Sequence, residues 1–174
     1  MRYLVLLALT LAAPATAQTA PPNATTFASI DGGTLSLDDW AGQPVLVVNT
    51  ASLCAYAPQL TALQTLYDTY KDEGLMVLAV PSDDFNQELA TGAEVKDYCE
   101  LQYGIDLPMT DITPVTGAEA HPFYRRVRAE TGFEPGWNFN KILLDGQGAV
   151  VGTWGSPADP MGRQITDAVT PLLD

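Results

Sequence analysis

Basic residues are scarce in this sequence. Lysine and arginine together number 8, against 21 aspartate and glutamate residues, and the formal net charge is -13. Nucleic-acid binding requires clustered basic side chains that neutralise phosphates, and anionic lipid surfaces attract the same residues. The composition therefore argues against nucleic acid and against anionic membranes as partners.

Histidine and cysteine are scarce too, with one histidine and two cysteines in the chain. No Cys/His cluster has the spacing of a zinc site. The residues that follow Cys54 are Ala55, Tyr56 and Ala57, so the C-x-x-C motif of thiol-disulfide oxidoreductases is also missing. We expect no cofactor, whether metal, haem or flavin.

Long apolar runs are missing beyond the first residues. The chain begins Met1-Arg2-Tyr3, is apolar from Leu4 to Ala13, and then carries Ala15-Thr16-Ala17. A basic start, a short apolar stretch and an A-x-A site are typical of a secretory signal peptide, whereas a membrane-spanning helix needs about 20 apolar residues. We predict cleavage after Ala17 and an exported protein, periplasmic or secreted. An uncleaved N-terminal anchor is the alternative.

The predicted domain organisation is simple. Residues 1–17 form the signal peptide, residues 18–26 are small and polar with two prolines and form a flexible leader, and residues 27–174 form one domain. This length suits a single hydrophobic core, and the chain has no internal repeat. Removal of Arg2 with the signal peptide leaves 7 basic and 21 acidic residues, a net charge of -14.

The hydrophobic pattern alternates between strands and helices. We expect short hairpin strands at 27–30 and 34–37, a helical turn at 37–42, buried strands at 44–49 and 75–80, helices at 58–71, 94–102, 120–130 and 161–173, a short segment at 107–112, and a hairpin at 141–154. Continuous apolar runs are typical of parallel strands buried on both faces, and a helix between them gives a right-handed crossover. The order predicts an α/β, thioredoxin-like fold, with a central mixed sheet flanked by helices and an N-terminal β-hairpin.

Cys54 follows the buried strand at 44–49 and precedes the helix that begins near Pro58. In open α/β sheets, sites form at the carboxyl ends of strands, and a helix N-terminus favours an anion. Both effects lower the pKa of a thiol and raise the fraction of thiolate, the form that attacks a peroxide O–O bond. We therefore predict that Cys54 is an accessible nucleophile. The alternative is a buried structural cysteine.

Four segments resemble, in order, motifs of the glutathione peroxidase family. They are NTASLCAYAPQ at 49–59, similar to the nucleophile signature, FNQE at 85–88, similar to F-G-x-Q-E, AHPFY at 120–124, similar to A-H-P-x-Y, and GWNFNK at 136–141, similar to W-N-F-x-K. The resemblance extends from about Phe27 to Leu173. It implies a Cys-type peroxidase for hydrogen peroxide or organic hydroperoxides, of the exported bacterial, thioredoxin-dependent kind.

The resemblance also implies a catalytic tetrad, formed by Cys54, Gln87, Trp137 and Asn138. Amide and indole N–H groups can hydrogen-bond the sulfur or the peroxide oxygen without a negative charge that opposes the thiolate. The segment before Gln87 departs from the family pattern, because it is one residue shorter and carries Asp83-Asp84 in place of the common Asn-Gln pair. A carboxylate that faced the sulfur would raise the pKa of Cys54.

Cys99 lies in a segment, residues 95–104, that resembles the family's F-C-x-L-x-Y-G helix. The resemblance implies that Cys99 is the resolving cysteine, which condenses with the sulfenic acid of Cys54. Because the reach of a disulfide is limited, we expect region 88–103 to be mobile in the oxidised state. A small core residue and a permanent Cys54–Cys99 bridge are the alternatives.

The sequence therefore predicts a thiol peroxidase that defends against oxidative stress. We expect a thioredoxin-like protein or glutathione as reductant. The short connection between Arg128 and Trp137, where tetrameric family members carry a longer loop, favours a monomer. A thiol-disulfide oxidoreductase and a non-enzymatic exported redox sensor or binding domain are the competing hypotheses.

Overall fold

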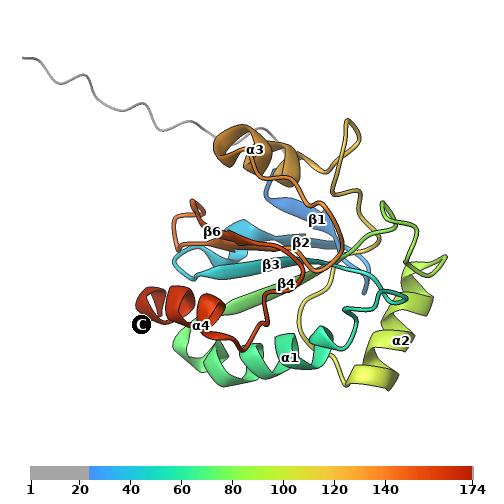
Figure 1. Ribbon diagram of the computed structural model, residues 1–174, viewed down its shortest axis with the longest axis horizontal. Helices are drawn as coiled ribbons and strands as arrows, with labels where there is room; N and C mark the ends of the chain where they lie inside the picture. Colours follow the sequence, from blue (N-terminus) through green and yellow to red (C-terminus); the bar gives the residue numbers. More distant parts are fainter. Residues whose placement is uncertain (1–23, 174) are drawn as a thin grey trace, which may run out of the picture.

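A computed structural model describes residues 24–173 of the chain (Figure 1). The predicted signal peptide, residues 1–17, and most of the predicted leader lie outside the described residues. Strand β1 (Thr26–Ala28) opens the regular structure one residue before the predicted domain boundary, and Ala24 is already buried.

The central sheet has four strands in the order β4-β3-β5-β6. They are β3 (Val45–Thr50), β4 (Met76–Pro81), β5 (Lys141–Leu144) and β6 (Val150–Trp154). β3 and β4 run parallel, while β5 is antiparallel to β3 and pairs with β6 as the predicted hairpin. Every residue of β3 is buried, as its continuous apolar run predicts. The predicted mixed sheet is confirmed.

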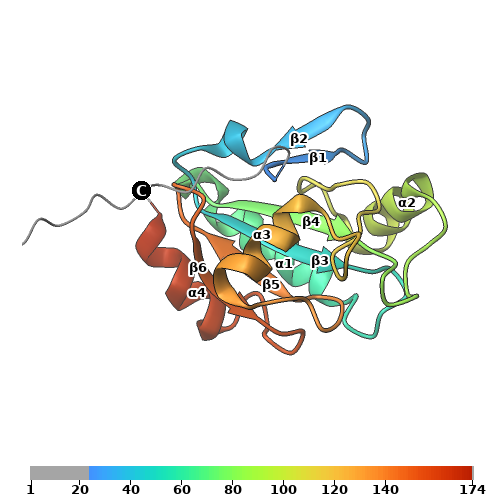
Figure 2. The ribbon, with the colours of Figure 1, turned by 90° about the horizontal axis from the view of Figure 1, so that it is seen from above.

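Helices cover both faces of this sheet. They are α1 (Gln59–Tyr70), α2 (Gly92–Tyr103), α3 (Pro122–Thr131) and α4 (Arg163–Val169). Figures 1 and 2 place α1 and α4 on one face and α3 on the other, with α2 beside one end of the sheet. The thioredoxin-like α/β arrangement is therefore confirmed.

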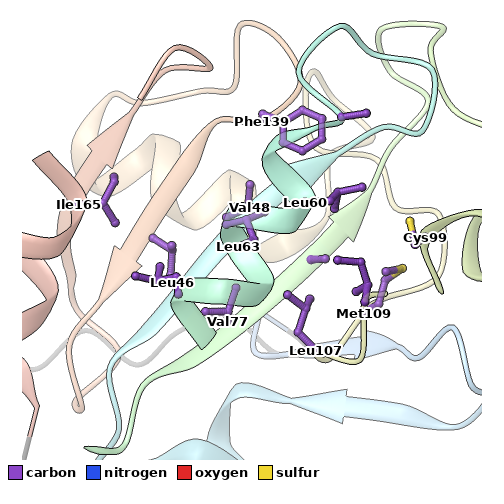
Figure 3. Close-up of a cluster of buried hydrophobic side chains, with 14 of the residues drawn as sticks. Leu46, Val48, Leu60, Leu63, Val77, Cys99, Leu107, Met109, Phe139 and Ile165 are labelled. Atoms are coloured by element: carbon purple, nitrogen blue, oxygen red, sulfur yellow. The ribbon is translucent and has the colours of Figure 1, made fainter. Parts of the chain in front are cut away.

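Alternate residues of β3 and β4 fill two separate cores. The α1-side core contains, among others, Leu46, Val48, Leu60, Leu63, Val77 and Ile165 (Figure 3). The α3-side core contains Val45, Val47, Leu78, Val80, Phe123 and Val127. Since side chains of a strand point alternately to opposite faces, one apolar run supplies both cores.

Helix ends follow local capping chemistry more closely than the apolar pattern does. α2 begins earlier than predicted because Thr91 and Glu94 form a reciprocal capping box. α1 continues into the turn η2 (Lys71–Glu73), and Gly74 ends it at φ 97°. The expected helix at 161–173 is shorter, because α4 ends at Val169 and Pro171 lies in a separate turn, η3 (Thr170–Leu172).

The N-terminal hairpin is confirmed as a separate two-stranded sheet. β1 pairs antiparallel with β2 (Thr34–Ser36), and the turn η1 (Leu37–Trp40) follows. The segment at 107–112 forms no strand. Its Met109 and Thr110 instead make single bridges to β4 and to the residue after β1, and so tie the hairpin to the central sheet. None of the helices between residues 24 and 173 has the length and apolar character to cross a bilayer.

Candidate active site

Cys54 lies in the loop that joins β3 to α1, at the carboxyl end of the parallel strands. The loop is a series of tight turns, in which Ala57 N–H donates to the carbonyl of Cys54 at 2.9 Å. Tyr56 N–H donates to Cys54 Sγ at 3.5 Å. A backbone donor is therefore directed at the sulfur of the predicted nucleophile.

The Cys54 side chain is largely covered. The residue retains 5% of its accessible surface and belongs to the α1-side core. This is less exposure than the sequence led us to expect for a nucleophile, because α1 and the sheet pack around it. Leu53, the preceding residue, is 60% exposed, and Trp137 is 42% exposed.

Gln87 and Asn138 meet beside this loop. Leu53 N–H donates to the carbonyl of Gln87 at 2.9 Å, which fixes residue 87 against the nucleophile loop. Asn138 Nδ2 donates to Gln87 Oε1 at 3.1 Å. Since Asn138 occupies Oε1, the Nε2 group is the donor that Gln87 can offer to another partner.

The Trp137 backbone is clamped by two asparagines. Asn49 Nδ2 and Asn140 Nδ2 both donate to the carbonyl of Trp137, at 3.0 and 2.6 Å. Two residues after Trp137, Phe139 adopts a left-handed backbone conformation. Its φ of 61° is a strained value for an aromatic residue. The Trp137 ring packs at a tilt on Phe85, with ring centroids 5.3 Å apart.

The structure thus brings the predicted residues together in part. Gln87 and Asn138 contact each other, and both segments that carry the three donors are tethered to residues 49–53. Within residues 24–173, the donor to the Cys54 sulfur is Tyr56 N–H, and no side chain of the three makes that bond. A role for the three in the reaction stays a prediction.

The two aspartates of the shortened segment bond elsewhere than the sulfur. Asp83 Oδ1 accepts from Glu88 N–H at 3.1 Å, and Asp84 Oδ2 accepts from the N–H groups of Val115 and Thr116. Asn86 N–H donates to the carbonyl of Asp83 at 2.8 Å and closes a tight turn. This tight turn therefore accommodates the shortened segment, and Gln87 follows it directly.

Cys99 lies on the inner side of α2, buried and free. Figure 3 shows its side chain between α2 and the part of the α1-side core that contains Leu107 and Met109. Burial, with smaller contributions from the charges of Glu88 and Glu100, raises the pKa of the Cys99 thiol to about 12. Cys54 is free as well, so a permanent bridge between the two cysteines is not what the structure contains.

Comparison with known proteins identifies the family. A family model described as glutathione peroxidase matches residues 23–128, more than half of the chain. The chain belongs to the glutathione peroxidase family.

Relatives in this family cover most of the chain. A glutathione peroxidase of Lactococcus lactis subsp. cremoris is 40% identical over 149 residues, 83% of this chain and 94% of that protein. A hydroperoxy fatty acid reductase of Synechocystis is 38% identical over 146 residues, 76% of this chain and 85% of that protein. The crystal structure of T. cruzi GPX1 is similar, with a TM-score of 0.64, 26% identity, and coverage of 84% and 92%. The protein is therefore a peroxidase, an oxidoreductase of the thiol type.

Sequence reasoning missed several polar residues that hold the site of this peroxidase together. Asn49 ends the apolar run of β3, and a polar residue at that place is a signal that could have identified it. Ser156 gives no local signal, although its Oγ donates to the carbonyl of Asn138 at 2.5 Å. Glu88, quoted only as part of a motif, accepts from Ser52 N–H at 3.0 Å through its Oε1 atom.

Lys141 of the peroxidase is an unexpected buried cation. Its side chain is fully covered, and its Nζ donates to Gln59 Oε1 at 2.5 Å and to the carbonyl of Ser156 at 3.2 Å. Burial lowers the pKa of Lys141 to about 8, with a small opposing effect from Asp159. The lysine therefore links the first residue of α1 to the segment that follows β6.

Proposed function

We propose that this peroxidase reduces hydrogen peroxide or organic hydroperoxides through a sulfenic acid on Cys54. The thiolate attacks the terminal peroxide oxygen, an S–O bond forms as the O–O bond breaks, and water or alcohol leaves after protonation. Gln87, Trp137 and Asn138 would donate hydrogen bonds to the peroxide oxygens during this step.

The observation that carries this proposal is the setting of the sulfur. Cys54 lies in the loop between the buried parallel strand β3 and helix α1, and Tyr56 N–H donates to its Sγ at 3.5 Å. The Gln87–Asn138 pair lies on segments tied to residues 49–53 by hydrogen bonds, which supports a shared role near the sulfur. Membership of the glutathione peroxidase family supports the same chemistry.

The second half of the proposed cycle uses Cys99. Its sulfur attacks the sulfenic sulfur of Cys54, an S–S bond forms, and the S–O bond breaks to release water. A thioredoxin-like protein or glutathione then reduces the disulfide by thiol exchange. We further propose an exported monomer, periplasmic or secreted, that protects against oxidative stress.

Peroxide consumption by the purified chain tests the cycle. We expect turnover with the unaltered chain, none with Cys54→Ser, and a single turnover with Cys99→Ser when thioredoxin is the reductant. Separate assays with thioredoxin and with glutathione identify the reductant. Full turnover by Cys54→Ser would overturn the assignment of the nucleophile.

A non-enzymatic redox sensor was the competing hypothesis from the sequence, and membership of a peroxidase family argues against it. Mass spectrometry after one equivalent of peroxide separates the two. A sulfenic acid or a new disulfide at Cys54 supports the proposed cycle, whereas an unmodified thiol contradicts the assignment of Cys54 as the nucleophile. A thiol-disulfide oxidoreductase is disfavoured, because Cys54-Ala55-Tyr56-Ala57 lacks the second cysteine of that motif.

A further inference from the structure

Glu88 is a buried carboxylate that bridges two loops. It lies between β4 and α2 and is 9% exposed. Its Oε1 accepts from Ser52 N–H at 3.0 Å, in the nucleophile loop, and from Leu89 N–H at 2.9 Å. Together with the bond from Leu53 N–H to Gln87, this contact fastens the segment before α2 to the residues that precede Cys54.

The carboxylate lacks a compensating positive charge. Among residues 24–173, no lysine or arginine forms an ion pair with Glu88. Its Oε2 and the nearby Ser52 Oγ are both buried without a hydrogen-bond partner. The charged neighbour is Asp83, whose Oδ1 accepts from Glu88 N–H. A buried anion in such surroundings costs free energy that exposure to water would recover.

This strain lies next to both cysteines. Ser52 lies two positions before Cys54 in the chain, and the charge of Glu88 contributes to the raised pKa of the Cys99 thiol. α2 buries Val95 and Cys99 fully, while its Tyr98 and Tyr103 are only partly buried against the same core. A disulfide requires Cα atoms within about 7 Å, so a helical Cys99 needs local opening to reach Cys54.

We propose that Glu88 is a positioning residue of the resolving step: its buried, unpaired carboxylate holds the segment before α2 in a strained closed form, and its release to water drives the opening that lets Cys99 reach Cys54. This inference rests on the proposed thiol cycle. Glu88 transfers no proton or electron in this scheme. It acts through the segment that carries the resolving cysteine.

The sign of the pH dependence follows from burial. Burial raises the pKa of Glu88 above 4.5, the negative charge of Asp83 adds to the effect, and hydrogen bonds from Ser52 and Leu89 partly oppose it. The protonated form is therefore favoured in the closed form. The closed form loses stability as pH rises through the raised pKa, so opening and resolution become faster toward neutral pH.

The test compares the unaltered chain with Glu88→Gln. Glutamine keeps the Oε1 acceptor for Ser52 N–H, and its amide can donate to Ser52 Oγ, so the closed form is retained without charge. After one equivalent of peroxide, stopped-flow measurement of sulfenic acid formation and of disulfide formation separates the two steps. We expect disulfide formation several-fold slower than in the unaltered chain, and no longer dependent on pH through Glu88.

Glu100→Gln is the matched control. Glu100 is exposed on α2 and also raises the pKa of Cys99, but it makes no contact with the nucleophile loop. Loss of either negative charge would by itself make Cys99 more reactive and speed resolution. Slower resolution in Glu88→Gln, but not in Glu100→Gln, therefore identifies the release of Glu88 and not a general charge effect.

The outcomes are distinct. Unchanged or faster disulfide formation in Glu88→Gln, or an equal slowing of sulfenic acid formation, overturns the role of Glu88 while the peroxidase cycle stands. No sulfenic acid at Cys54 of the unaltered chain overturns the cycle itself. Hydrogen exchange adds a second measurement, because α2 amides should exchange less in peroxide-treated Glu88→Gln than in the treated unaltered chain.

Discussion

Asn86 adopts φ 55°, a left-handed conformation, in the tight turn that compensates for the shortened segment. Asparagine and glycine tolerate this region, whereas a β-branched residue clashes with its own backbone there. We expect Asn86→Gly to retain stability and Asn86→Val to lower the free energy of unfolding by about 1–2 kcal/mol. Urea denaturation of both variants measures this difference.

Ala90→Val serves as the control for Asn86→Val. Ala90 is exposed in the same connection and has no left-handed backbone, so valine there should change the free energy of unfolding little. Equal losses in the two valine variants would show that the turn conformation is not the cause. Because Gln87 follows directly, Asn86→Val should also slow sulfenic acid formation at Cys54.

The site residues found from sequence are those with distinctive side chains in motifs. Cys54, Gln87, Trp137 and Asn138 could be selected because each supplies a recognisable chemical group in a known pattern. The Tyr56 N–H donor could not, because every non-proline residue has a backbone amide and only the fold directs one at a sulfur. Burial of Glu88 was hidden for a similar reason, since it depends on the packing of two loops distant in sequence.

At the scale of elements, β5 begins with a buried cation, Lys141. The folded protein holds it at a pKa of about 8, against 10.5 for an exposed lysine. As pH rises above about 8, the folded state releases the proton before the unfolded state does, so the free energy of unfolding rises until pH 10.5. The shift corresponds to roughly 3 kcal/mol at most. Denaturation series across this pH range measure the rise.

Lys141→Met should abolish that rise. Methionine has a similar length and removes the titrating group from the interior. Lys71→Met is the control, because Lys71 is exposed and pairs with Asp68 on the surface. A rise that persists in Lys141→Met would mean that another group governs stability in alkaline solution.

Strands and helices were predictable from the sequence where the apolar pattern was long and continuous, and less so where that pattern was short or interrupted. The apolar runs at 44–49 and 75–80 identified β3 and β4, because strands covered on both faces need apolar residues throughout. The segment at 107–112 makes only single bridges, because Pro108, Thr110 and Asp111 interrupt its apolar residues. The sequence predicted one helix to residue 173, but α4 ends at Val169, and Pro171 lies in the separate turn η3.

At the scale of the whole molecule, charge sets which peroxides approach readily. The predicted mature chain carries a net charge of -14, and Lys141, which bonds to the first residue of α1, is buried. We expect kcat/KM for a hydroperoxide that bears a carboxylate to rise with ionic strength, because salt screens the repulsion. The value for hydrogen peroxide, which is neutral, should stay constant and serves as the internal control. Equal salt responses would contradict this field effect.

The order of elements determined the fold more firmly than any single residue did. A β-α-β unit followed by a helix and a β-hairpin places β3 inside the sheet, with β4 parallel to it at the edge, and leaves both faces to be covered. The junction of β3 and α1 then lies at the edge where such folds present ligand sites. How far Cys54 is covered was not predictable, because it depends on the packing of the α1-side core around the residue.

The low exposure of the Cys54 side chain would select reagents by size. A small peroxide displaces little to reach a sulfur in a residue that is 5% exposed, whereas a bulky thiol, disulfide or alkylating agent must first displace the groups that cover it. A thiol screened in this way would still react with its small oxidant and yet be protected from random mixed disulfides.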